Sequence, residues 1–202
     1  PEALASALAG LTVGQARLVL ALALVEQGEM TVPHVLKAKA KVLAADVPGL
    51  EIVTPDVTLE DVAGLDALVD WIKATRRVIQ DPDGAEAFGL PAPKGVILAG
   101  IPGGGKSLTA KALANGFGLG LLRLDLGAMM GSLVGQSESQ IRKALQVTEA
   151  MAPVVCWVDE IEKAISSGQI GAGGDSGTSS RVIGTFITWM SEKTAPVFVV
   201  AT

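Results

Sequence analysis

Residues 95–107 have the sequence GVILAGIPGGGKS, in which an apolar run leads into a glycine-rich turn and then a lysine–serine pair. Positions 100–107 fit the pattern G-x-x-x-x-G-K-[ST], which marks a phosphate-binding loop when a strand precedes it and a helix follows it. Both are expected here, because 95–99 is apolar and 106–115 carries apolar residues at helical spacing. The segment therefore predicts a strand–loop–helix unit that binds phosphate, and this context disfavours the alternative of a plain glycine turn.

The composition of this loop follows from the chemistry of holding an anion. Backbone N–H groups must turn inward around the phosphates, and residues without a Cβ adopt the required backbone angles at the lowest cost. Lys106 is placed to reach the β and γ phosphates and Ser107 to coordinate Mg²⁺, while the following helix directs its positive dipole end at the ligand. The expected nucleotide-binding residues are Gly100, Ile101, Pro102, Gly103, Gly104, Gly105, Lys106, Ser107 and Leu108.

A second part of the site is expected after the apolar run 154–158, which ends in the adjacent carboxylates Asp159 and Glu160. Parallel strands deliver their carboxyl ends to one edge of a sheet, where ligands bind, so this pair is expected to meet the phosphate loop. Neighbouring strand residues point in opposite directions. We therefore expect Asp159 to contact Mg²⁺ through water and Glu160 to orient and deprotonate an attacking water, with two solvated strand-end acids as the alternative.

Short apolar strands alternate with helical segments after residue 50, which predicts an α/β fold with a parallel sheet and helices on both faces. The expected strands are 95–99, 121–124, 154–158 and 197–202. The expected helices are 65–80, 106–115, 138–151 and 181–192, with a turn at 81–84 and a short extended piece at 50–54.

A small helical hairpin is expected ahead of this α/β region. One helix starts at Thr12 and Gln15, which have capping-box spacing, and a second ends before Pro48. The first helix is apolar nearly all round, so it is expected to be sandwiched between neighbours. We therefore divide the chain into an N-terminal helical segment, 1–50, and an α/β domain, 51–202.

Composition excludes several classes of protein. Of the 202 residues, 49% are hydrophobic and 18% charged, which suffices for one sizeable core and excludes general disorder. The net charge is −5 and the 16 lysines and arginines are scattered, so nucleic-acid binding is not expected. The longest apolar run, 18–25, is shorter than the roughly 20 residues that span a bilayer, so no membrane association is expected. The single cysteine, Cys156, favours a reducing, cytoplasmic compartment.

Together these motifs resemble the AAA family of ring-forming ATPases. The resemblance includes the phosphate loop, the acids Asp159 and Glu160, and the segments DVAGL at 61–65 and FGLPAPKGV at 88–96. It spans about residues 10–202 and is greatest to the hypothetical-reading-frame AAA proteins of cyanobacteria and algal plastids and their bacterial relatives. The fold that it implies is a P-loop NTPase sheet, in which strand 197–202 lies between the phosphate-loop strand and the strand of Asp159.

The resemblance also implies contacts and an assembly. Val62 and Gly64 would lie near the adenine of ATP, and the protein would form a homo-hexameric ring. Segment 132–138 would face the central pore, where Leu133 and Val134 would contact an unknown protein client. Ordinary packing of this region, with Met129 and Met130, is the alternative for those residues.

Departures from the family pattern limit what is expected of this chain. Gly104 stands where Thr is common, which predicts a more flexible loop, and Leu133 replaces the usual pore aromatic, which argues against a strong threading grip. The chain starts at Pro1, shows no leader peptide, and stops before the sensor, arginine-finger and lid elements of the family. We therefore expect a fragment that binds nucleotide and turns it over poorly alone, from a cytoplasmic protein, or a stromal one if plastid-encoded.

Three functions fit these features to different degrees. The first is hydrolysis of Mg·ATP coupled to the remodelling or regulation of a protein partner. The second is an ATP-dependent oligomeric scaffold with slow or no hydrolysis, which the leucine at position 133 favours. The third, a phosphoryl-transfer kinase, is weaker because a glutamate directly after Asp159 suits the activation of water.

Overall fold

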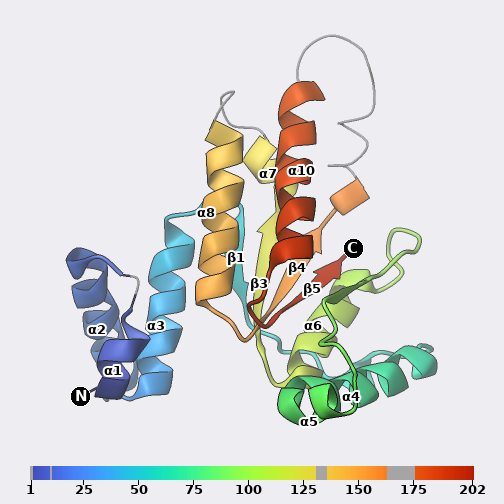
Figure 1. Cartoon of the computed structure of the whole chain (residues 1–202), viewed down its shortest axis with the longest axis horizontal. Helices are drawn as coiled ribbons and strands as arrows, with labels where there is room; N and C mark the ends of the chain where they lie inside the picture. The colour runs from blue at the N-terminus through green and yellow to red at the C-terminus, as the bar shows by residue number, and fades with distance from the viewer. Residues whose placement is uncertain (1, 10, 131–135, 163–175) are drawn as a thin grey trace.

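A five-stranded sheet in the order β1-β3-β4-β5-β2 forms the centre of the molecule (Figure 1). The computed structural model describes residues 2–9, 11–130, 136–162 and 176–202. The strands are β1 Leu50–Val53, β2 Gly95–Ile97, β3 Gly120–Asp125, β4 Val154–Asp159 and β5 Val197–Ala201. The predicted parallel pairing is confirmed for β2 to β5, and β5 lies between β2 and β4 as the resemblance implied.

The extended piece at 50–54 joins this sheet in the opposite direction. β1 pairs antiparallel with β3, with Leu50 opposite Leu124, so the sheet is mixed rather than wholly parallel. An edge strand has only one neighbour to match, and an antiparallel edge on a parallel sheet is common in such folds. The prediction of a parallel sheet is therefore correct for four strands and incomplete at this edge.

The helices of the described residues agree with most of the expected ones. They are α1 Glu2–Ala7, α2 Val13–Gln27, α3 Val32–Ala45, η1 Leu59–Asp61, α4 Asp66–Gln80, α5 Pro82–Ala87, α6 Lys106–Phe117, α7 Leu126–Met130, α8 Gln136–Ala150 and α10 Ser176–Glu192. The turn predicted at 81–84 is wrong, because this segment begins the short helix α5. Asp81 caps that helix by accepting a hydrogen bond from the Gly84 N–H at 3.0 Å, and Pro82 suits a first helical position.

Helices cover both faces of the sheet, as predicted, because strand residues alternate between two cores. Leu122, Cys156 and Val199 belong to the core beneath α8 and α10. The residues that follow them along these strands lie on the other side of the sheet. Trp157 and Val200 pack with α6 and α4 in the second core, and Arg123 lies beside Trp157. Met129 is fully buried in the first core, which confirms the packing alternative for that residue.

The N-terminal helices α1 to α3 lie beside the β1 edge of the sheet (Figure 1). The predicted capping box of α2 is present, with Thr12 and Gln15 each accepting a hydrogen bond from the other's backbone N–H. These helices share a small core of their own, while Ala44 and Val47, at and just after the end of α3, pack into the core under α8. The division at residue 50 therefore remains a proposal. No helix of the described residues has the length and apolarity that crossing a membrane requires.

One glycine is needed for the sheet to close around the phosphate-loop strand. A Cβ on Gly95 would overlap the carbonyl oxygen of Val199 on β5 and lie 3.0 Å from its carbonyl carbon. We expect Gly95→Ala to lower the free energy of unfolding by about 1–3 kcal/mol, because backbone atoms cannot move aside cheaply. Gly120→Ala is the matched control, since a Cβ at that strand start meets only Val154 at 3.8 Å. Urea unfolding of both variants checks this, and equal losses would contradict it.

Candidate functional site

The predicted phosphate loop follows β2 and ends where α6 begins. Gly103 and Gly105 both have a backbone φ of 79°, in the left-handed region that favours glycine. The N–H of Gly104 donates to the Ile101 carbonyl at 3.1 Å and so closes a turn, and the Thr109 hydroxyl bonds the Gly105 carbonyl at 3.0 Å. The glycines of this motif therefore provide the bend that carries the chain from the sheet into the helix.

The residues predicted to hold the phosphates all lie on this bend or on the first turn of α6. Gly105 and Lys106 are half-buried, and the exposed ones are Gly100, Ile101, Pro102, Gly103, Gly104, Ser107 and Leu108. The Lys106 ammonium lies across the loop, where it donates to the carbonyl oxygens of Gly100 at 3.0 Å and Ile101 at 3.2 Å. Water-exposed carbonyls are partners that phosphate oxygens can replace at little cost, because an anion binds an ammonium group more strongly.

The sheet brings the phosphate loop and the predicted acids to one edge. β2 and β4 lie on either side of β5, with Ile97 and Val158 both opposite Ala201. Neighbouring strands lie about 4.8 Å apart, so the strand of Asp159 is about 10 Å from the phosphate-loop strand. Asp159 shares the face of Trp157, which packs in the core beneath α6, so its carboxylate lies on the face of the sheet that the phosphate-loop helix covers.

A hydrogen-bonded network that the sequence analysis did not predict holds the Asp159 carboxylate. Arg123 on β3 donates to Asp159 Oδ2 from Nε at 3.1 Å and from Nη2 at 2.8 Å. Thr202 donates its hydroxyl to Asp159 Oδ1 at 3.1 Å and accepts a hydrogen bond from Trp157 Nε1 at 2.9 Å. The side chain of Asp159 is only 17% exposed, and the Arg123 guanidinium at 2.8 Å compensates the charge of its carboxylate.

Arg123 is itself held by its surroundings. Its guanidinium lies 5.3 Å from the centre of the Trp157 ring and forms a second ion pair with Glu51 of β1 at 3.4 Å. Partial burial acts to lower the pKa of Arg123, but the hydrogen bond and charge of Asp159, with the charges of Glu51 and Asp125, outweigh burial and raise the pKa. The guanidinium therefore stays charged beside Asp159 at every physiological pH.

Glu160 has an unusual backbone conformation. It is an exposed residue with a φ of 54°, the one non-glycine residue with positive φ among those described. The backbone ladder continues around it, because the Thr202 N–H donates to the Val158 carbonyl and the Ile161 N–H donates to the Thr202 carbonyl. Such a conformation costs of order 1 kcal/mol in a residue with a side chain and clusters at functional sites. The left-handed backbone at Glu160 follows directly on the last residue of β4, Asp159, so the strand alternation that the sequence suggested for this pair does not extend to the Glu160 side chain.

The site has the chemistry needed for a nucleotide with Mg²⁺. Among the described residues no group of three or more His, Cys, Asp or Glu side chains could hold a metal ion by itself. Mg²⁺ in phosphate sites needs no such cage, since one or two protein oxygens, phosphates and waters complete its coordination. The Ser107 hydroxyl and, through water, the Asp159 carboxylate are the protein oxygens that would hold it, and the left-handed Gly103 and Gly105 form a loop suited to phosphates.

The segment predicted to lie near adenine borders a recess at the C-terminal end of α6. Val62 is buried, and Val62 and Gly64 line a recess of about 780 Å³ with Asn115 and Gly116 of α6. Helical rise places Gly116 about 15 Å from Lys106, so this recess opens toward the end of α6 away from the phosphate loop. The contact of Val62 and Gly64 with adenine stays a prediction.

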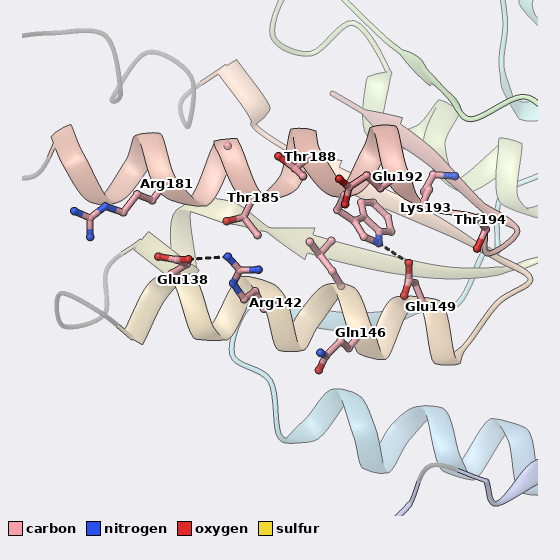
Figure 2. Close-up of a pocket in the computed structure, with 13 residues that line it drawn as sticks. Glu138, Arg142, Gln146, Glu149, Arg181, Thr185, Thr188, Glu192, Lys193 and Thr194 are labelled. Atoms are coloured by element: carbon pink, nitrogen blue, oxygen red, sulfur yellow. Dashed lines mark hydrogen bonds and ion pairs between the residues drawn. The ribbon is translucent and has the colours of Figure 1, made fainter.

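A separate groove of about 570 Å³ lies between α8 and α10 (Figure 2). Its polar groups include an ion pair between Arg142 and Glu138 at 2.8 Å and a hydrogen bond from Trp189 Nε1 to Glu149 at 2.8 Å. The hydrogen bond from Arg142 lowers the pKa of Glu138. Because α8 and α10 cover the face of the sheet opposite to α6, this groove is separate from the phosphate loop.

Comparison with known proteins agrees with this geometry. Residues 96–202 match the family described as AAA, the ATPase family associated with various cellular activities. The chain belongs to the AAA family. It is 43% identical over 196 residues to the AAA domain-containing protein ycf46 of Guillardia theta, which covers 96% of this chain and 38% of that protein. It is 52% identical over 142 residues to ycf46 of Pyropia yezoensis, which covers 70% of this chain and 28% of that protein.

A more distant AAA relative is the proteasome-activating nucleotidase of Methanopyrus kandleri, which is 32% identical over 139 residues, 67% of this chain and 31% of that protein. The chain thus spans well under half the length of these relatives. The predicted resemblance to AAA proteins of algal plastids is confirmed, and AAA proteins bind nucleotide through a P-loop.

Some residues of this AAA site were missed by sequence reasoning, and some predicted ones lie outside the described part. Arg123 and Thr202 were not predicted, although a single arginine inside the apolar strand 120–125 is a visible signal. Leu133 and Val134, predicted to contact a client, lie outside the described residues. The side chain of Met130 is not described either, so its packing stays open.

Proposed function

We propose that this AAA protein binds Mg·ATP, hydrolyses it, and uses the cycle to remodel or regulate a protein partner. The observation that carries the proposal is the placement of the Lys106 loop and of the acids Asp159 and Glu160, at the end of β4, at one edge of the sheet, with β5 between them. A loop alone supports phosphate binding. A loop at the same sheet edge as two adjacent carboxylates supports in-line attack of water on the γ phosphate.

Each residue of the site has a separate role in this proposal. Lys106 would stabilise charge on the β and γ phosphates, and Glu160 would orient the attacking water and accept its proton. Ser107 and Asp159 would hold Mg²⁺, which when bound neutralises charge on the phosphate oxygens. The left-handed backbone at Glu160 supports its assignment, because such conformations in residues with a side chain cluster at functional sites.

The assembly and the location are part of the same proposal. We propose a homo-hexamer in which Leu133 and Val134 contact the protein client, in the cytoplasm, or in the stroma if the protein is plastid-encoded. The plastid ycf46 relatives support the location, and an AAA relative that activates the proteasome supports action on protein clients. The chain leaves most of its relatives' length unmatched, so the whole protein is needed for these tests.

The experiment is ATP titration of the full-length protein by calorimetry, followed by assay of released phosphate with and without Mg²⁺. Tight binding with Mg²⁺-dependent phosphate release is the expected result. Absence of ATP binding would overturn the proposal. ATP-dependent assembly without phosphate release would replace it by the scaffold, and a phosphorylated acceptor in place of free phosphate would replace it by the kinase.

A further inference from the structure

Arg123 stands out because it is a cation between two leucines in the middle of β3, a strand with a neighbour on each side. Its neighbours on β3, Leu122 and Leu124, are fully buried, while the Arg123 side chain is 33% exposed. The guanidinium carbon lies 5.3 Å from the centre of the Trp157 ring, so the side chain is only partly in solvent. Placing a cation on this strand costs desolvation free energy. The hydrogen bonds from Arg123 to the carboxylate of Asp159 explain why the cation lies there.

The hydrogen bonds to Asp159 can be counted against what a carboxylate accepts. An ionised carboxylate has about four acceptor positions. Arg123 fills two of them at Oδ2, and the Thr202 hydroxyl fills one at Oδ1. Among the hydrogen bonds of the described residues, this leaves about one position for a ligand of the site. That position suffices for one hydrogen bond from a metal-bound water, the contact that the sequence predicts for Asp159.

We propose that Arg123 is a positioning residue. It holds Asp159 so that this carboxylate would contact Mg²⁺ through water rather than directly, and it moderates the affinity of the site for Mg²⁺. The inference rests on the proposed function, since it assumes that Mg·ATP binds beside Asp159. Arg123 acts in two ways. Its fork of donors fixes the carboxylate plane, and its positive charge opposes the approach of a divalent cation.

The two effects of removing Arg123 have opposite signs, which makes the inference testable. Loss of the positive charge raises the affinity for Mg²⁺, because Asp159 is then an uncompensated, largely buried anion. Loss of the fork would leave the Asp159 carboxylate free to rotate, so Mg²⁺ would no longer be held in one position relative to the phosphates and the water that Glu160 orients, and hydrolysis would slow. A residue that only stabilised the fold would lower both affinity and rate.

The test uses the full-length protein and its Arg123→Gln, Arg123→Met and Arg123→Lys variants. Calorimetry measures the affinity for ATP in EDTA and at saturating Mg²⁺, and the ratio of the two reports how strongly the protein and the metal cooperate. We expect Gln and Met to raise that ratio about 5- to 10-fold, the size of the effect of a unit charge on a nearby divalent ion in a water-rich site. The turnover number should fall at least about 10-fold, while Lys, which keeps the charge, restores the ratio to within about twofold.

Arg142→Gln is the matched control, because it removes an arginine from an ion pair on α8, on the opposite face of the sheet, and should change neither quantity. Met keeps an unbranched stem over Trp157, so it yields the measurement even if the Gln variant does not fold. An unchanged or lowered ratio in the neutral variants would overturn the role of Arg123. Failure of the wild-type protein to bind ATP would instead overturn the proposed function.

Discussion

Replacing Lys106 by methionine is expected to weaken ATP binding by about 100-fold or more, because charge-assisted hydrogen bonds to phosphate are among the strongest that a side chain makes. The structure places the ammonium across the loop, on the Gly100 and Ile101 carbonyls, so it is already directed at the space that the loop encloses. Methionine preserves the length and apolar stem of lysine and removes only the charge and the donors. The measurement is calorimetric titration of the full-length variant with ATP in EDTA, which isolates the phosphate contacts from the metal.

Lys111→Met is the control for this change. Lys111 lies on the same helix, α6, and its half-buried side chain forms an ion pair at 3.6 Å with Asp56, which is exposed. Exposed ion pairs contribute little, so this variant should bind ATP within about twofold of the wild type. The stability of both variants should also be unchanged within about 0.5 kcal/mol, because the carbonyls that Lys106 leaves are open to water. ATP binding that survives in the Lys106 variant would contradict the assigned phosphate site.

The second large effect is expected at Glu160. Glu160→Gln should reduce turnover by about 10²- to 10⁴-fold, the range that general-base catalysis contributes, because an amide cannot accept the proton of water. ATP affinity should stay within about threefold, since Glu160 is expected to touch the water and not the nucleotide. The readout is phosphate release under saturating Mg·ATP, with ATP binding measured on the same sample.

The geometry makes Glu160→Gln a clean substitution. Glutamine has the same size as glutamate and tolerates the φ of 54° no worse, so the bend after β4 should be preserved. Glu162→Gln is the control, because Glu162 is an exposed acid two residues further along the same segment. If both variants hydrolysed ATP at the wild-type rate, Glu160 would not be the base, and another acceptor at this edge of the sheet would be needed.

What the sequence by itself determined is the part of the site that depends on contiguous residues. The phosphate loop could be predicted because its turn, its lysine and its helix start lie within residues 100–107, and local backbone geometry follows from local composition. Asp159 and Glu160 could be predicted at a strand end for the same reason. The alternation of apolar strands with helices was enough to predict a mainly parallel sheet with two covered faces, since the period of the side chains sets which face is buried.

Only the tertiary structure decided which distant residues complete the site. The partners of Asp159 come from β3 and from the end of β5, and their distances to it follow from the register of β3 and β5 against β4, with Arg123 opposite Trp157. Register is set by packing over the whole sheet, so it is not visible in any single strand. The antiparallel edge β1, which brings Glu51 to Arg123, is likewise a result of pairing between strands. The charge compensation of Asp159 therefore depends on long-range contacts, while the chemistry of the phosphate loop depends on a short run of residues.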